Sequence, residues 1–221
     1  STTPRWVPSA QVQLDDLVQN STRTIATYSG SVGIPFQWVS LDATHQALLN
    51  SPMTPPGTAD GANVLAFLRG ERKHEGTIYR TRGHILGDII NAEPVILREP
   101  YYAYLDSGYA SYKVAYTKTT PRTKVVFQAA NDGMLHTFKA DTGAELWAYV
   151  PGLLFDSRLS AYPNTSTLAN LSFRSGFTHL YMVDGNPAAG DVDFGNTLSA
   201  SPTTADWRAL LVGGLNKGGR G

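Results

Sequence analysis

Three strand-like runs separated by two tight-turn signals constrain the fold of this chain most strongly. Residues 125–129, 134–138 and 145–150 are rich in β-branched, aromatic and other apolar residues. Asn131-Asp132-Gly133 and Asp141-Thr142-Gly143 lie between them, and both are turn sequences whose glycine accepts a positive φ angle. Strands spaced by roughly ten residues predict an antiparallel meander, which is the unit of a β-propeller blade.

Each part of this motif has a predicted structural role. The first turn supplies positive φ angles for a hairpin, and the Asp141 side chain caps backbone N–H groups in the second turn. Trp147 is placed where a large indole wedges against a neighbouring blade. The residues that we assign to the blade motif are Asn131, Asp132, Gly133, Asp141, Thr142, Gly143 and Trp147.

Outside the motif, the pattern divides the chain into two parts. We expect residues 1–83 to be a lead-in segment with short strands and helices, packed on the propeller. Within it we expect a strand at 35–39, a helix at 44–50, a helix at 61–68 capped by Asp60, and a solvated basic loop at 71–83. We expect residues 84–221 to form the first blades of a propeller that is cut before completion.

Further strands are predicted in the second part, at 94–97, 178–183 and 208–212. Residues 207–214 resemble the strand and turn at 124–133, so a second copy of the motif begins there, with its returning strand expected beyond Gly221. The predicted fold class is therefore mainly β: a truncated β-propeller of four-stranded blades, with a few short helices and long insertions.

Composition excludes several classes of function. The 221 residues include 18 basic and 18 acidic side chains, so the net charge of zero argues against a nucleic-acid-binding face. The chain has no cysteine, which excludes disulfides and thiol catalysis within these residues. No apolar run reaches the 18 residues of a membrane-spanning segment.

No residue pattern predicts an enzyme. The histidines at 45, 74, 84, 136 and 179 match no metal-binding spacing. We expect His136 and His179 to be hydrogen-bonded residues of the core or of a blade edge. Asp184, Asp191 and Asp193 lie close together, but they lack the alternating ligands of a calcium loop, and a turn is the better interpretation.

Several segments resemble the PilC/PilY family of type IV pilus proteins in an ordered succession. The two turns of the motif and the strand after them, residues 131–151, look like that family's blade signature. Residues 67–71, 86–94, 179–185 and 211–214 also match in order. The resemblance covers most of the chain, from about residue 45 to residue 221.

The resemblance implies an exported protein at the pilus tip or on the outer-membrane surface of a Gram-negative bacterium. Such proteins assemble pili together with minor pilins, oppose retraction in twitching motility, and in some cases adhere to host cells. It implies no cofactor in this fragment. Some members carry a calcium loop in the propeller, and we place any such Ca²⁺ site beyond Gly221.

Two alternatives remain open from the sequence. The turn motif is shared with propeller dehydrogenases that bind pyrroloquinoline quinone, and a generic protein- or carbohydrate-binding propeller would also fit. For the partner contact, we expect a tyrosine-rich insertion, residues 99–119, to project from the propeller rim. Its predicted contact residues are Tyr101, Tyr102 and Tyr104.

Overall fold

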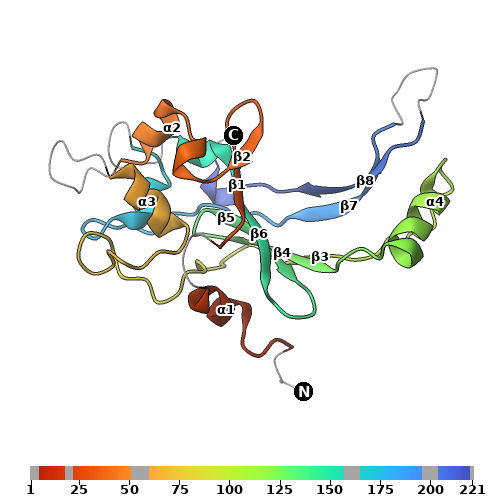
Figure 1. Cartoon of the computed structure of the whole chain (residues 1–221), viewed down its shortest axis with the longest axis horizontal. Coiled ribbons are helices and arrows are strands. Elements are labelled where there is room, and N and C mark those ends of the chain that lie inside the picture. The colour runs from red at the N-terminus through yellow and green to blue at the C-terminus, as the bar shows by residue number, and fades with distance from the viewer. Residues whose placement is uncertain (1–4, 18–21, 51–59, 157–164, 196–203, 220–221) are drawn as a thin grey trace.

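The predicted meander forms the centre of the main β-sheet (Figure 1). The computed structural model describes residues 5–17, 22–50, 60–156, 165–195 and 204–219. Its strands are β1 (Ile25–Tyr28), β2 (Gly33–Pro35), β3 (Val95–Leu97), β4 (Val125–Ala130), β5 (Met134–Lys139), β6 (Glu145–Val150), β7 (Ala188–Asp193) and β8 (Trp207–Val212). The three runs of the motif are thus β4, β5 and β6, with boundaries within one residue of the prediction.

The main sheet has the order β2-β1-β6-β5-β4-β3. Strands β3, β4, β5 and β6 pair antiparallel in sequence order, as a four-stranded blade requires. On the far side of β6, β1 pairs in parallel and brings its hairpin partner β2 with it. Residues from both sides of the predicted boundary at 83 therefore share one sheet.

The hairpin between β4 and β5 has a three-residue loop. Gly133 has a φ angle of 89°, whereas Asn131 and Asp132 keep negative φ angles, so only the glycine supplies the left-handed conformation that we assigned to the whole turn. A Cβ atom on Gly133 would also lie 2.7 Å from a methyl group of Leu168. The glycine is thus needed both for its backbone angle and for close packing.

The helices are short and are spread over the molecule rather than gathered at one end (Figure 1). They are α1 (Ala10–Asp16), α2 (Ala43–Leu48), α3 (Gly61–Leu68) and α4 (Tyr109–Val114), which continues as the π-helical turn η2 (Ala115–Thr119). Four 3-10 turns accompany them: η1 (Trp38–Ser40), η3 (Gly152–Phe155), η4 (Ala169–Ser172) and η5 (Asn216–Gly218). The predicted helices at 44–50 and 61–68 correspond to α2 and α3.

Asp60 is the N-cap residue of α3, as predicted, but its side chain does not cap the helix. Its carboxylate instead accepts a hydrogen bond from the Tyr79 hydroxyl at 3.0 Å. The Asn50 side chain takes over the cap and accepts from the Gly61 backbone N–H at 2.9 Å. The tertiary contact with a buried tyrosine outcompetes the local capping geometry.

Two other local predictions are corrected. Of the strand predicted at 35–39, only Pro35 lies in a sheet, as the last residue of β2, and the chain then turns into η1. The loop 71–83 is not simply solvated, because the Arg82 side chain is buried. Its guanidinium donates to the Phe67 and Glu71 carbonyls and pairs with Glu75 at 2.6 Å.

The stretch predicted as a strand at 178–183 has no regular secondary structure. The Met182 backbone N–H donates to the Asn131 side-chain carbonyl at 3.0 Å rather than to a neighbouring strand. Met182 and Val183 are buried in the main core, which explains the apolar pattern of this stretch. The apolar residues of this stretch therefore reflect burial in the core and not a β-strand.

Strands β7 and β8 form a separate antiparallel hairpin, and β7 lies against β3. Both sheets are open, and the described part of the chain contains no closed propeller. The described residues therefore form a mixed arrangement of open sheets and short helices, which contains a four-stranded antiparallel unit but not the closed ring of a complete propeller. Within the described residues, no helix has the length and apolar character needed to cross a membrane.

Candidate functional site

A chain of buried charges runs through the blade motif. The Arg23 guanidinium makes a bidentate pair with the Glu145 carboxylate, at 2.7 and 2.8 Å. The same carboxylate contacts His136 Nδ1 at 2.8 Å, and His136 Nε2 contacts the Asp132 carboxylate at 3.0 Å. Side chains of Arg23 and Glu145 are each 2% exposed and that of His136 is fully buried. Two cations and two anions alternate, so the chain of charges is neutral.

The neighbours of each group keep it ionised. Burial opposes the charge of His136, but Asp132 and Glu145 outweigh it and raise the pKa of His136 to about 9. Burial likewise acts to raise the pKa of Glu145, but hydrogen bonds from Arg23 and His136 outweigh it and lower that pKa to about 2. The histidine therefore acts here as a structural cation.

The lead-in segment closes around this chain of charges. Arg23 donates to the Arg69 carbonyl at 2.9 Å, and Arg69 donates back to the Arg23 carbonyl at 2.8 Å and to the Phe36 carbonyl at 2.8 Å. The blade motif and residues 23–69 are thus connected through paired buried side chains. We expect the free energy of this connection to depend on every member, because one unpaired buried charge is costly.

Residues 86–94 form hydrogen bonds both with the hairpin turn at 131–133 and with Asp184. The Gly87 backbone N–H donates to the Asp132 carboxylate at 2.9 Å, and Asn131 Nδ2 donates to the Asp88 carboxylate at 3.0 Å. Further along, Asn91 donates to the Asp184 carboxylate at 2.7 Å, which also accepts from other groups of the chain. The predicted turn at Asp184 is therefore a junction of hydrogen bonds.

Three of the segments that carried the family resemblance, residues 86–94, 131–151 and 179–185, meet at this junction. His179 Nε2 lies 2.9 Å from the Asp88 carboxylate and its side chain is 42% exposed, so it lies at an edge, as expected. Asn216 donates to the Asp184 carboxylate at 3.0 Å. Among the described residues, no cluster of three or more His, Asp or Glu side chains is arranged to hold a metal ion.

The second turn of the motif differs in detail from the prediction. Gly143 has a φ angle of 76°, as a tight turn requires. The Thr142 hydroxyl, rather than the Asp141 carboxylate, accepts a hydrogen bond from the Ala144 N–H at 3.3 Å. The Trp6 ring packs where a Gly143 side chain would stand, only 2.7 Å from an added Cβ. This turn thus receives the N-terminal segment.

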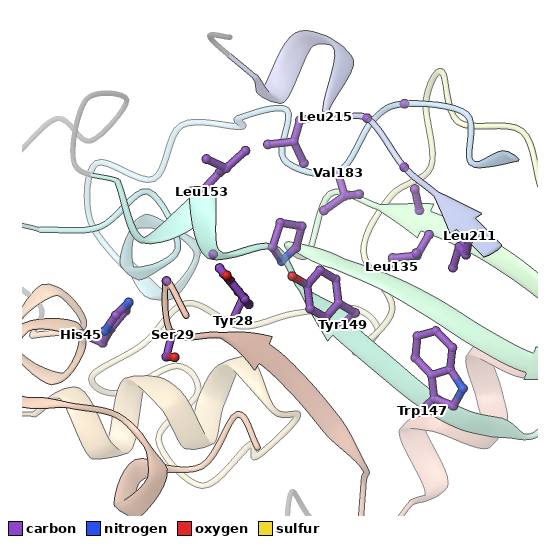
Figure 2. A pocket seen from close by; sticks show the side chains of 17 residues that line it. Tyr28, Ser29, His45, Leu135, Trp147, Tyr149, Leu153, Val183, Leu211 and Leu215 are labelled. Atoms are coloured by element: carbon purple, nitrogen blue, oxygen red, sulfur yellow. The ribbon is translucent and has the colours of Figure 1, made fainter. Parts of the chain in front are cut away.

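A cavity of about 800 Å³ lies on one face of the meander (Figure 2). It is lined by Leu135, Trp147 and Tyr149 of the meander and by Val183, Leu211 and Leu215 from later in the chain. Trp147 is half-buried and packs 5.9 Å from the Phe127 ring. The predicted wedge residue thus lines an apolar cavity between the meander and the end of β8.

The tyrosine-rich insertion forms an aromatic arm, which we define as residues 98–124. In Figure 1, its helix α4 lies at the end of the molecule opposite α2 and α3. Tyr101, Tyr102 and Tyr104 are 53%, 42% and 40% exposed. The Tyr101 ring lies tilted against that of Tyr102, with centroids 4.2 Å apart; Tyr102 stacks on Tyr104 at 5.1 Å, and Tyr104 stacks on Trp207 of β8 at 5.8 Å. The structure brings the three predicted contact residues together.

The arm is anchored to the β7–β8 hairpin by a polar contact. Arg122 pairs with Asp191 of β7 at 2.7 Å, and the Tyr112 hydroxyl donates to the same carboxylate at 2.7 Å. Trp207 Nε1 donates to the Ser107 carbonyl at 2.9 Å. Asp191, whose sequence context favours a turn over a calcium loop, thus fixes the arm in place.

Sequence reasoning missed the buried charges and this anchor. The partners are 122 residues apart for Arg23 and Glu145 and 69 residues apart for Arg122 and Asp191. A buried-strand histidine four residues after the turn aspartate was the one local signal, since alternating residues of a strand share a face. That pattern would have suggested a pair between His136 and Asp132.

The comparisons with known proteins agree with the resemblance. The family model described as "PilY1 beta-propeller domain" matches residues 86–221. The type IV pilus biogenesis factor PilY1 of Pseudomonas aeruginosa strain PAO1 is 34% identical over 228 residues, covering 96% of this chain. A PilY1 homolog of Xylella fastidiosa is 34% identical over 167 residues, covering 72% of this chain.

The chain spans 18% and 12% of the length of these two relatives. No solved structure is significantly similar to it. The matched family is one of pilus biogenesis factors rather than of quinone-dependent dehydrogenases. The resemblance in the motifs is thereby confirmed, and this chain belongs to the PilY1 β-propeller domain family.

Proposed function

We propose that this chain is part of an exported, non-catalytic protein that promotes assembly of type IV pili, opposes their retraction and takes part in adhesion. The protein acts at the pilus tip or on the outer-membrane surface, in contact with minor pilins and, during adhesion, with the host-cell surface. The observation that carries the proposal is the similarity to pilus biogenesis factors over nearly the whole chain. The junction at Asp88, Asn131 and Asp184 supports it, because the matching motifs depend on one another there.

Surface pili counted by electron microscopy test this function. We expect deletion of the full-length gene to remove surface pili, and we expect pili to return when retraction is also disabled. If the deletion removed surface pili both with retraction intact and with retraction disabled, the protein would act in pilus assembly and not in opposing retraction. Unchanged pili in both backgrounds would contradict the proposal and make quinone binding and dehydrogenase activity the next measurement.

We also propose that residues 84–221 form the first blades of a propeller, with residues 1–83 packed on them. Strand β7 lies against β3, and Leu211 of β8 lines the same cavity as Ala129 of β4. The β7–β8 hairpin thus resembles the first two strands of a second blade stacked on the first. Two further strands of that blade would lie over β5 and β6, where Leu135, Trp147 and Tyr149 line the cavity.

Finally, we propose that Tyr101, Tyr102 and Tyr104 touch a partner in the pilus complex. Their exposure, and their position on an arm away from the main core, support this role. Full-length protein in which all three are replaced by serine should lose co-purification with minor pilins. Val39→Ser is a suitable control, because Val39 is 88% exposed and lies in η1. Unchanged co-purification of the triple variant would remove these tyrosines from the interface.

A further inference from the structure

The aromatic arm has a charge that the whole chain lacks. Residues 98–124 contain five basic and two acidic side chains, a net charge of +3, in a chain whose net charge is zero. Two of the basic residues are neutralised: Arg122 pairs with Asp191 and Lys124 pairs with Glu99 at 3.2 Å. The remaining charge is available for contacts outside the chain.

Two of the remaining cations lie directly on the exposed tyrosines. The Arg98 guanidinium stacks on the Tyr101 ring at 4.3 Å from its centroid. Lys113 Nζ donates to the Tyr101 and Tyr102 carbonyls at 3.2 and 2.8 Å. Among the residues that the structure describes, no carboxylate pairs with Arg98 or Lys113. A stacked guanidinium keeps its N–H groups, at its edge, free for a carboxylate.

The stacked rings present their edges rather than their faces. One face of Tyr101 is covered by Arg98, and the rings from Tyr101 to Trp207 cover one another. Ring edges carry the positive part of the aromatic quadrupole, so they favour oxygen atoms with negative charge. A sugar ring that stacks on an open aromatic face fits this arrangement poorly.

Most acidic side chains at this end of the molecule have partners of their own, including Glu99, which follows Arg98 in the chain and pairs with Lys124. Asp193 accepts hydrogen bonds from the Gly195 and Asp206 backbone N–H groups, and Asp206 pairs with Arg208. Asp106 is the acidic residue of the arm that stays exposed, next to Leu105, which is fully exposed. The Tyr101 end is therefore mainly basic and aromatic, and the exposed aliphatic side chains of the arm are Leu105 and Val114.

We infer that the Tyr101 end of the arm binds an acidic segment of a protein partner, with Arg98 and Lys113 holding a carboxylate at the edge of the stacked tyrosines. This inference rests on the proposed partner contact and names its chemistry. Two exposed aliphatic side chains, Leu105 and Val114, offer little apolar area for insertion into a membrane, which favours a peptide over a lipid surface. Charge complementarity of this kind sets specificity and association rate.

Binding of labelled peptides to the 221-residue chain tests the inference. The probe is a peptide of alternating glutamate and leucine, followed by fluorescence anisotropy at low salt, and a glutamine–leucine peptide of equal length serves as the neutral comparison. We expect the acidic peptide to bind at least tenfold more tightly, and added salt to remove most of the difference. Equal binding of both peptides would overturn the inference.

Variants locate the site. Arg98→Glu should weaken binding of the acidic peptide by about tenfold, and Lys113→Gln should weaken it less. Lys73→Glu is the matched control, since Lys73 is exposed and lies outside the arm. Circular dichroism melts check that each variant folds. An equal loss in Arg98→Glu and Lys73→Glu would overturn the inference, because net charge alone would then explain binding.

Two further probes, an anionic lipid and an anionic glycan, test whether the site prefers another negatively charged ligand to an acidic peptide. Binding of phosphatidylglycerol vesicles or of heparin that exceeds peptide binding, and that depends on Arg98, would overturn the inference in favour of a lipid or glycan ligand. The outcome is independent of the pilus function. Selective binding of the acidic peptide, combined with unchanged pili after gene deletion, would contradict the proposed function but not this inference. Loss of pili, combined with equal binding of both peptides, would contradict this inference but not the proposed function.

Discussion

The buried chain of charges and the aromatic arm use the same types of side chain for opposite purposes. Arg23 and Arg98 are both arginines, but the first is 2% exposed and fully paired with Glu145, whereas the second is exposed and stacked on Tyr101. His136 packs parallel to the Phe138 ring at 5.6 Å inside the sheet, while the arm stacks its tyrosines in solvent.

The comparison teaches that pairing, rather than residue type, separates structural charges from those available to a ligand. A buried charge must be paired, since its desolvation costs several kcal/mol, and the pairing then specifies which segments meet. An exposed cation is stabilised by solvent, so an unpaired one costs little free energy and can still bind a ligand.

Replacing Glu145 by leucine should have the largest effect. The variant leaves Arg23 and His136 without their shared carboxylate, inside the core. We expect the free energy of unfolding, measured by urea denaturation, to fall by about 3–5 kcal/mol. Glu99→Leu is the matched control, because Glu99 pairs with Lys124 at the surface of the arm. The free energy of unfolding of this control variant should be unchanged. Similar losses in both variants would break the comparison.

The stability of the chain should have a maximum between about pH 4.5 and about pH 6.5. The pKa of His136 is raised from 6.5 to about 9, so its contribution is complete below 6.5 and disappears as the pH rises through 9. The pKa of Glu145 is lowered from 4.5 to about 2, so its contribution is complete above 4.5 and disappears as the pH falls toward 2.

Urea denaturation at a series of pH values measures both limbs. We expect the alkaline limb to amount to about 3 kcal/mol. His136→Gln should remove the alkaline limb, because the neutral amide does not titrate. A variant that retained the full alkaline limb would assign that limb to another group.

Gly87→Ala tests the contact between residues 86–94 and the hairpin turn. A Cβ atom at Gly87 would lie 2.4 Å from the Asp132 backbone N, so one of the two segments has to move. We expect a loss of about 1–3 kcal/mol in the free energy of unfolding. Gly83→Ala is the matched control, since no atom lies within 4 Å of its added Cβ. Equal stabilities would show that the two segments separate easily.

The sequence predicted the local parts of this structure well. The strands β4, β5 and β6 follow from apolar runs bounded by Gly133 and Gly143, because a hairpin is set by its own turn and register. The helix α3 followed from its apolar residues and from Gly70, whose φ angle is 117°. Neighbouring residues determine such elements, so a single sequence contains the information.

The long-range parts could not be predicted. The parallel pairing of β1 with β6, the pair of Arg23 with Glu145, and the capture of Asp60 by Tyr79 each depend on which segments fold against one another. The tyrosines of the arm were identified as a cluster, but their stacking on Trp207 joins segments about a hundred residues apart. Tertiary contacts of this kind override local preferences.

Tyr101→Ser should have the smallest effect on stability and therefore sharpens the comparison most. Tyr101 is 53% exposed, and it contributes a hydroxyl bond to Tyr102 and a ring contact to Arg98 at the surface. We expect the free energy of unfolding to change by less than about 1 kcal/mol, since solvent replaces these contacts. Tyr109→Ser, eight residues further on, is the control: Tyr109 is 1% exposed and packs on Trp207 at 4.7 Å, so its loss should cost about 3–5 kcal/mol.

Tyr101→Ser should nevertheless weaken binding of the acidic peptide, because it removes the ring that supports Arg98. A large stability loss in Tyr101→Ser with no change in peptide binding would show that the exposed tyrosines are part of the arm's own packing, and the division between paired structural groups and available binding groups would then fail at the arm.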